Sequence, residues 1–317
     1  MGKNFKYLDD LIHSDIDEIV LDTDIILEKG EEFFYSKGIT LDIDDIVIDG
    51  CGHIIDADKK ARIFNCTGKK ITIRNVTLKN GHSTEDGGAI FNDEGEIIIE
   101  NSLILNNDAE EFGGAINNWG VLNILNSKIC ENKAEYGGAV FNDDGELRIA
   151  NSFFHQNKAI KGGALFNNDG GEMIIEKSQL SDNSADNGGV IFNENCELSI
   201  FESVLNNNIA FEDGGAMHCT GELKINGSQL NHNTSNRDGG AIYIRKADLK
   251  IDESIFNENR SNRDGGAIYS FDSELYIYES ELKKNCAQSR GAIMLSDSYY
   301  ESNNCIFKDN KLDDCET

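Results

Sequence analysis

The sequence predicts an all-β parallel β-helix, a solenoid with about 25 residues per coil, and three observations support this class. A Gly-Gly-Ala-Ile-Phe-Asn motif returns in related form at steps of 24 to 26 residues. Each unit contains three short runs in which apolar residues alternate, as in half-buried strands. Proline is absent from the 317 residues, as expected where every coil donates N–H groups to its neighbours. The motif copies begin at Gly87, Gly113, Gly137, Gly162, Gly188, Gly214, Gly239, Gly265 and Arg290.

An unbroken repeat behaves as one quasi-linear domain, so residues 1–317 are expected to form a single β-helix domain. Within it we expect an N-terminal cap region at 1–20, irregular first coils at 21–80 and regular repeats at 81–312. Phe5, Leu8, Leu11 and Ile12 recur at the spacing of one helical face. This spacing predicts a short helix that caps the first coil, where a strand stack would otherwise expose unpaired backbone groups.

The glycine motif is the first run of each unit, and the residue types in its columns predict their direction. Its fourth position is always aliphatic and is expected to point inward, whereas alternation places the alanine column before it and the column after it outside. The sixth position changes from Asn to Cys, Ile, Ser and Leu, which an interior ladder permits. Stacked asparagines there would satisfy one another through amide hydrogen bonds.

The second and third runs are also predicted to be strands with one buried face. The second run carries an aliphatic-x-Ile pair, and the third centres on one apolar column that follows a serine by two residues in most units. A further Asn column, from Asn107 to Asn310, closes the third run. Gly81 stands at the matching position of the preceding coil, and this exchange predicts a backbone with positive φ.

The fifth position of the motif is mainly aromatic, and alternation predicts that its side chains are exposed, one per coil. Rings at this spacing stack as a ladder that stabilises neighbouring strands. A contiguous exposed apolar surface also serves as a flat platform for sugar rings or for a protein partner. The candidate ligand-binding residues are Phe91, Phe141, Phe166, Phe192, Tyr243 and Tyr269.

Charge limits the classes of partner. The chain has 57 Asp and Glu against 29 Lys and Arg, a net charge of -28, which repels phosphate backbones and anionic lipids. No run approaches the roughly 18 apolar residues of a membrane-spanning helix, so neither nucleic-acid binding nor membrane insertion is expected. We interpret the acidity as a solubility feature, with salt adaptation or loose calcium binding as alternatives. Arg237 and Arg263 are predicted to form surface ion pairs of little energetic weight.

Neither a metal nor another cofactor is predicted. The eight cysteines include no C-x-x-C pair and the six histidines are dispersed, so no group has metal-ligand spacing. Most cysteines are interpreted as small buried apolar residues, with a disulfide between neighbouring coils left open. Residues 311–317 contain no second capping helix, so end-to-end self-association at an uncapped C-terminal end is a further expectation.

The repeat resembles a known group of proteins. The Gly-Gly-Ala-Ile motif combined with Phe-x-x-Asn, at 154–157 and 256–259, is similar to the repeats of chlamydial polymorphic outer membrane proteins. Residues 46–56, 62–64 and 71–81 resemble adhesin-like β-helix proteins of methanogenic archaea. The resemblance covers roughly residues 40–310 and implies a single-stranded, right-handed parallel β-helix at the cell surface or outside the cell, for adhesion or as a stalk. Residues 1–10 lack the features of a signal peptide.

Two functional classes follow. The leading one is a non-enzymatic, adhesin-like surface or structural protein that binds a glycan or a cell-surface protein along the aromatic ladder. The alternative is a polysaccharide lyase or glycoside hydrolase, because right-handed β-helices include pectate lyases and polygalacturonases. Such chemistry needs carboxylates held at a fixed separation. No catalytic residue is predicted, because coil length is constant and acidic pairs such as Asp143–Asp144 recur in the turns of other units.

Overall fold

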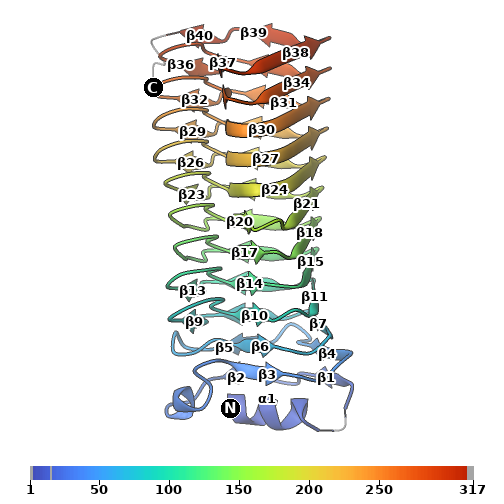
Figure 1. Ribbon diagram of the computed structural model, residues 1–317. Coiled ribbons are helices and arrows are strands. Elements are labelled where there is room, and N and C mark those ends of the chain that lie inside the picture. Colours follow the sequence, from blue (N-terminus) through green and yellow to red (C-terminus); the bar gives the residue numbers. More distant parts are fainter. Residues whose placement is uncertain (1–2, 15, 313–317) are drawn as a thin grey trace.

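The computed structural model describes residues 3–14 and 16–312, and nearly all of them belong to one parallel β-solenoid (Figure 1). The turns stack into a straight column with the N-terminal helix at one end. One sheet has 12 strands, one from each turn, and neighbouring turns pair in parallel and in register. For example, Ile90 lies beside Ile116, and Phe166 lies beside Phe192. The predicted fold class is confirmed.

The first two runs of each turn form one sheet of 20 strands. Its strands are β1 (Glu18–Val20), β3 (Ile39–Leu41), β4 (Ile46–Asp49), β6 (Phe64–Cys66), β7 (Lys70–Arg74), β10 (Ile90–Asn92), β11 (Glu96–Glu100), β14 (Ile116–Asn118), β15 (Val121–Leu125), β17 (Val140–Asp143), β18 (Glu146–Ala150), β20 (Leu165–Asn168), β21 (Glu172–Glu176), β24 (Ile191–Phe201), β27 (Met217–Asn226), β30 (Ile242–Asp252), β33 (Ile268–Phe271), β34 (Glu274–Tyr278), β37 (Ile293–Ser296) and β38 (Tyr299–Asn303).

The third runs form the 12-stranded sheet, and short strands after them form two smaller sheets. The 12 strands are β2 (Ile25–Ile26), β5 (Ile54–Asp56), β8 (Thr77–Lys79), β12 (Leu103–Leu105), β16 (Lys128–Cys130), β19 (Phe153–His155), β22 (Gln179–Ser181), β25 (Val204–Asn206), β28 (Gln229–Asn231), β31 (Ile255–Asn257), β35 (Glu281–Lys283) and β39 (Ile306–Lys308). The small sheets contain β9 (His82–Ser83) with β13 (Asp108–Ala109), and then β23 (Ser184–Ala185), β26 (Ile209–Ala210), β29 (Thr234–Ser235), β32 (Arg260–Ser261), β36 (Cys286–Ala287) and β40 (Lys311–Leu312).

The capping helix α1 (Phe5–Ile12) has the bounds that the sequence predicts. The side chain of Asn4 accepts a hydrogen bond from the N–H of Tyr7, which satisfies one of the free donors of the first turn. Phe5, Leu8 and Ile12 are fully buried, and the helix packs on β2 and β3. The helix thus closes the apolar interior at this end of the column.

The aliphatic columns point inward as predicted, but the prediction for the alanine column is wrong. Ala89 and Ala115 are fully buried and belong to the main core. The N–H groups of Ala89 and Ile90 both donate to the carbonyl oxygen of Ala115, at 2.8 and 2.9 Å. Two successive N–H groups that point the same way show that the backbone bends at the start of the strand. The alternation of side chains therefore does not extend back to the alanine.

The interior asparagine ladder of the first run is confirmed. The amide nitrogen of Asn92 donates to Oδ1 of Asn118 at 2.6 Å, and Asn118 donates to Asn142 in the same way. The ladder continues through Asn167 to Asn193, and all five side chains are fully buried. Buried amides are tolerated here because each finds its partner one turn away.

The second asparagine column does not have the positive φ that the sequence predicts. That conformation falls one residue earlier, at exposed positions such as Asn106 (φ 54°) and Glu131 (φ 58°). The side chain of Asn107 is buried instead, and its Oδ1 accepts the N–H of Gly81 at 2.7 Å. A Cβ at Gly81 would lie 2.2 Å from the carbonyl oxygen of Gly88. Glycine occupies position 81 because of this close approach, and not because of its φ.

Four cysteines match the buried interpretation: Cys66 and Cys219 are fully buried, and Cys130 and Cys196 are 4% exposed. Burial raises the pKa of each of these four thiols. Cys286 takes part in a disulfide. The expected open C-terminal end falls at 311–317, of which 313–317 lie outside the described residues.

Candidate binding surfaces

The aromatic residues of the motif stack along the outside of the core, as the ladder interpretation predicts. Ring centroids lie 5.1 Å apart for Phe141 and Phe166, and 5.0 Å apart for Phe166 and Phe192. Further along, the rings of Tyr243 and Tyr269 lie 5.2 Å apart and are parallel within 1°. The parallel, in-register pairing of successive turns produces this continuity. Such pairs contribute about 0.2–1 kcal/mol each to strand pairing.

The predicted exposure of this ladder is wrong for its central part. Phe141, Phe166 and Phe192 are 5%, 3% and 6% exposed. Phe112 and Tyr136 cover Phe141 and Phe166, each from the position before the first glycine of the motif one turn earlier. The ring of Phe112 lies 4.6 Å from that of Phe141, and the ring of Tyr136 lies 5.7 Å from that of Phe166. These five side chains form a small second core, so a flat open platform does not exist there.

The two ends of the ladder remain partly accessible. Phe91, Tyr243 and Tyr269 are half-buried, and Phe91 contacts the exposed ring of Trp119 edge to face at 5.2 Å. Trp119, the only tryptophan of the chain, is not among the binding residues predicted from the sequence. The sequence signal that could have identified it is a single aromatic residue in a turn of Asn and Gly. Ligand contact by the ladder residues stays a prediction.

His218 occupies one step of the ladder as a neutral imidazole. Its ring lies 4.6 Å from those of both Phe192 and Tyr243. Its Nδ1 is enclosed and has no hydrogen-bond partner among the described residues. Burial, assisted by the positive charges of Lys161 and Arg245, lowers the pKa of His218 from 6.5 to about 3.

This lowered pKa predicts a loss of stability in acid. Between about pH 6.5 and pH 3 the unfolded chain binds a proton at His218 and the folded chain does not, so the free energy of unfolding decreases as pH falls. Relative to wild type, His218→Phe should therefore gain stability by up to about 1.4 kcal/mol for each pH unit below 6.5. Denaturant titrations at pH 7.5, 6, 5 and 4 measure this difference. A difference that does not change with pH contradicts the expected protonation.

Two buried carboxylates lie beside the ladder. Asp213 and Asp238 are 7% and 5% exposed, and burial raises both pKa values. However, the N–H of Asp238 donates to Oδ1 of Asp213 at 3.1 Å, and the N–H of Asp264 donates to Oδ1 of Asp238 at 3.2 Å. Both carboxylates thus connect adjacent turns.

The arginines form ion pairs at the surface, as the sequence predicts, but their carboxylate partners lie one turn away, and for Arg237 they include the exposed Glu212 at 3.6 Å. Arg237 lies 3.7 Å from Asp213, and Arg263 lies 3.7 Å from Asp238, so each arginine reaches back one turn to a buried carboxylate. The sequence showed only the adjacent Asp, because the pairing across one turn depends on the coil register.

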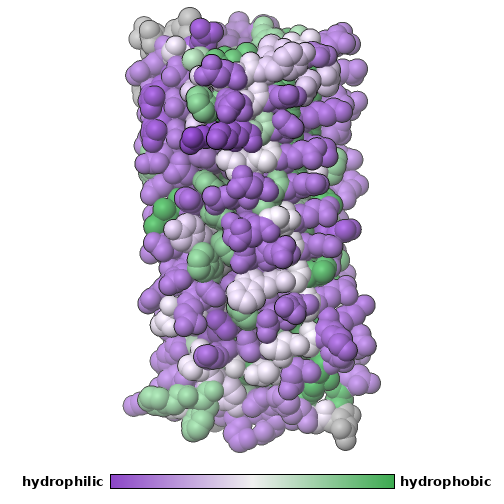
Figure 2. All heavy atoms as spheres, viewed as in Figure 1, coloured by the Kyte–Doolittle hydropathy of each residue, from purple (hydrophilic) through white to green (hydrophobic). Residues whose placement is uncertain are grey.

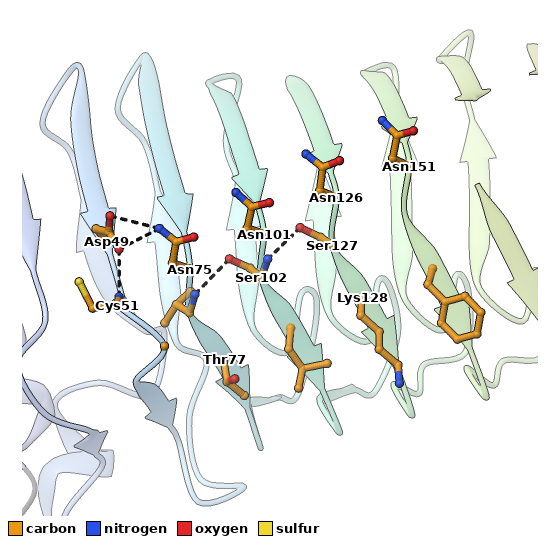
Figure 3. Close-up of a pocket in the computed structure, with 14 residues that line it drawn as sticks. Asp49, Cys51, Asn75, Thr77, Asn101, Ser102, Asn126, Ser127, Lys128 and Asn151 are labelled. Atoms are coloured by element: carbon orange, nitrogen blue, oxygen red, sulfur yellow. Dashed lines mark hydrogen bonds between the residues drawn. The ribbon is translucent and has the colours of Figure 1, made fainter. Parts of the chain in front are cut away.

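A shallow groove runs across several turns at the edge of the 12-stranded sheet (Figure 3). Its floor contains Ser102 and Ser127, and the N–H of Ser102 donates to Oγ of Ser127 at 3.1 Å. Exposed amides one turn apart form its rim, and Lys128 and Phe153 also line it. These rim residues are Asn101, Asn126 and Asn151. The groove offers hydrogen-bonding groups along its floor and rim.

Across residues 3–14 and 16–312, no three or more His, Cys, Asp or Glu side chains come together in a way that could hold a metal ion. None of the helices described there is long and apolar enough to cross a membrane. Hydrophilic residues dominate the face shown in Figure 2, with apolar side chains in small separate patches.

The fold and these surfaces define a parallel β-solenoid repeat protein. One segment, residues 253–270, matches the Chlamydia polymorphic membrane protein repeat. This match supports the expected resemblance to the chlamydial repeats, while the likeness to archaeal proteins stays a prediction. No curated protein matches the chain.

Two solved structures are similar at low identity. The first, "L. reuteri 53608 SRRP", is 14% identical, with 96% of this chain and 98% of that chain covered at a TM-score of 0.40. The second, "L. reuters 100-23 SRRP", is 13% identical, with 97% and 94% covered at a TM-score of 0.42. Both are too distant to support a functional assignment.

Proposed function

We propose that the chain is a non-enzymatic, adhesin-like β-helix protein of the cell surface, which serves as a stiff stalk and binds a glycan or protein partner along its side. The observation that carries this proposal is the unbroken ladder of turns. Neighbouring turns share backbone hydrogen bonds, two buried asparagine ladders and a ring stack. Such a column resists bending and keeps a lateral surface in a fixed orientation.

The distribution of chemical groups supports binding over catalysis. The best-placed carboxylates, Asp213 and Asp238, accept backbone N–H groups and pair with arginines, which are structural tasks. The repeat match supports surface display, because its family is described as a polymorphic membrane protein. Pairing of two copies through their C-terminal ends is a separate proposal, which sedimentation at high protein concentration tests.

Surface display and binding can be tested together. An antibody against the purified chain should label intact source cells without permeabilisation, and the chain should bind components of a glycan array or of whole cells. The same preparation should release neither reducing nor unsaturated ends from acidic polysaccharides, with or without calcium. Labelling only after permeabilisation would contradict a location at the cell surface. Release of sugar ends would instead support the polysaccharide lyase or hydrolase alternative.

A further inference from the structure

A compact pocket of about 480 Å³ lies on the side of the first regular turns. One wall comes from Lys37, just after the 3-10 helix η1 (Glu31–Phe33), and a second from Lys60 and Arg62, which precede β6. The segment 82–86, which begins with β9, and the rings of Phe91 and Trp119 complete it. Neither the repeat motif nor the candidate ladder accounts for this combination of cations and exposed aromatic surface.

Arg62 is the fixed element of the pocket. It stands where later motifs have their second glycine, and its side chain is almost fully enclosed, at 7% exposure for the residue. Its Nε donates to the carbonyl oxygen of Gly87 at 2.9 Å, and its Nη2 donates to Oγ of Ser83 at 3.2 Å and to the carbonyl oxygen of Asp86. Among the described residues, Nη1 has no hydrogen-bond partner, so one edge of the guanidinium has N–H groups to offer a ligand.

The aromatic wall adjoins this cation. The guanidinium carbon of Arg62 lies 5.1 Å from the centroid of Phe91, and Phe91 in turn contacts Trp119. Trp119 is 44% exposed. An exposed indole beside a charged group offers an apolar face to a ligand whose other edge is polar. Asn65 and Thr84 also line the pocket and add groups that hydrogen-bond to hydroxyls.

The pocket is less acidic than the molecule as a whole. Its lining contains Lys37, Lys60 and Arg62 against Glu85 and Asp86, and Lys60 pairs with Asp58 outside the lining, so Lys37 and Arg62 balance the two carboxylates. The whole chain carries -28. Guanidinium groups bind carboxylates with directed, charge-assisted hydrogen bonds. An anion that approaches this acidic molecule therefore finds here a locally balanced site with a preorganised donor in Arg62.

We propose that this pocket binds one carboxylated sugar residue of a glycan, with the carboxylate on Arg62 and Lys37 and the apolar ring face on Trp119. The inference rests on the proposed function and specifies its ligand class. A sugar residue fits better than an acidic peptide side chain, because the pocket combines a flat aromatic wall, a single anion site and hydroxyl-bonding side chains within a volume suited to one ring. Lys60 already pairs with Asp58 and belongs to the rim.

Trp119 is the only tryptophan, so its fluorescence reports on this pocket alone. Oligomers of a uronic acid should change the emission saturably, and neutral oligomers of the same length should not. Lys37→Ala and Arg62→Gln should each weaken binding by about tenfold. Lys69→Ala serves as the matched control, because its side chain is 89% exposed and lies outside the pocket, and it should bind like wild type. Lys37→Ala keeps the test valid if Arg62→Gln fails to fold, since no hydrogen bond or ion pair is seen for Lys37 among the described residues.

Calorimetry on Trp119→Phe checks the stacking role without the optical signal and should show weakened binding. The pocket assignment is overturned if folded wild type does not respond to uronic acid oligomers, if Lys37→Ala and Lys69→Ala bind alike, or if an oligoglutamate peptide binds more tightly than the sugar. If the chain binds a glycan and none of these variants affects the binding, the pocket is excluded as the binding site, but the proposed adhesin function is not contradicted. Absence of both surface labelling and any binding would remove the proposed function itself.

Discussion

Replacing Asn157 with alanine is expected to lower the free energy of unfolding by about 3–5 kcal/mol. Asn157 is 1% exposed, and its Oδ1 accepts both the N–H and the side-chain amide of Asn132, at 3.1 and 3.0 Å. Its own amide donates to the carbonyl oxygen of Ile129 and to Oδ1 of Asn183. Truncation leaves the N–H of Asn132 unpaired, removes one of the two hydrogen bonds of the Asn132 side-chain amide and takes a donor from the carbonyl of Ile129, and each unpaired group costs about 1–3 kcal/mol.

Urea titration followed by circular dichroism measures the change in free energy. Lys158→Ala is the matched control, because this neighbouring side chain is exposed and makes no hydrogen bond or ion pair that the structure shows, so its effect should stay within about 0.5 kcal/mol. Equal stability of the two variants would show that the asparagine ladder does not bind adjacent turns together.

Gly189→Ala is expected to destabilise the column by more than about 4 kcal/mol and to disrupt the pairing of its turn with the next. A Cβ at this position would lie 2.1 Å from the carbonyl oxygen of Gly215 and 2.8 Å from the carbonyl carbon of Ile209. Both obstacles are backbone atoms, so no rotamer change relieves the overlap. The turns would have to separate, which breaks several ladder hydrogen bonds at once.

Gly227→Ala separates this steric effect from the general cost of replacing a glycine. Gly227 has φ 60°, but the nearest obstacle to a Cβ is a side-chain carbon of Glu202 at 3.6 Å, and Glu202 itself takes φ 46° one turn earlier. The cost should stay near 1 kcal/mol. Thermal and urea unfolding of both variants give the comparison, and similar losses for the two would refute the close packing of turns at Gly189.

Sequence periodicity was sufficient to predict most of the architecture, because every turn buries and pairs the same positions. A residue that stays aliphatic in nine units must face the interior, and Asn92 with its successors must stack because only a neighbouring amide can satisfy a buried one. The helix at Phe5–Ile12 followed from a helical spacing next to an open strand end. These inferences needed only the period and the residue types.

Periodicity failed where the backbone bends or where a turn is covered by another segment. The alanine column is buried because two successive N–H groups share one carbonyl, which breaks the alternation that the sequence suggests. Phe141 and Phe166 are covered because Phe112 and Tyr136 fold over them from positions that look like loop residues. The central part of the ladder therefore has no exposed platform for the binding that the sequence predicts.

The amino-acid pattern by itself determined the solenoid, its period, its capping helix and the asparagine ladder of the first run, since these depend on contacts that recur at one spacing. Only the tertiary structure decided which aromatic rings stay accessible and that Lys37, Arg62 and Trp119 share one pocket. These three residues come from three different turns and break the repeat, so no internal comparison of units could reveal them. Their meeting depends on how the turns stack, which fixes side chains about 25 residues apart within a few ångströms of one another.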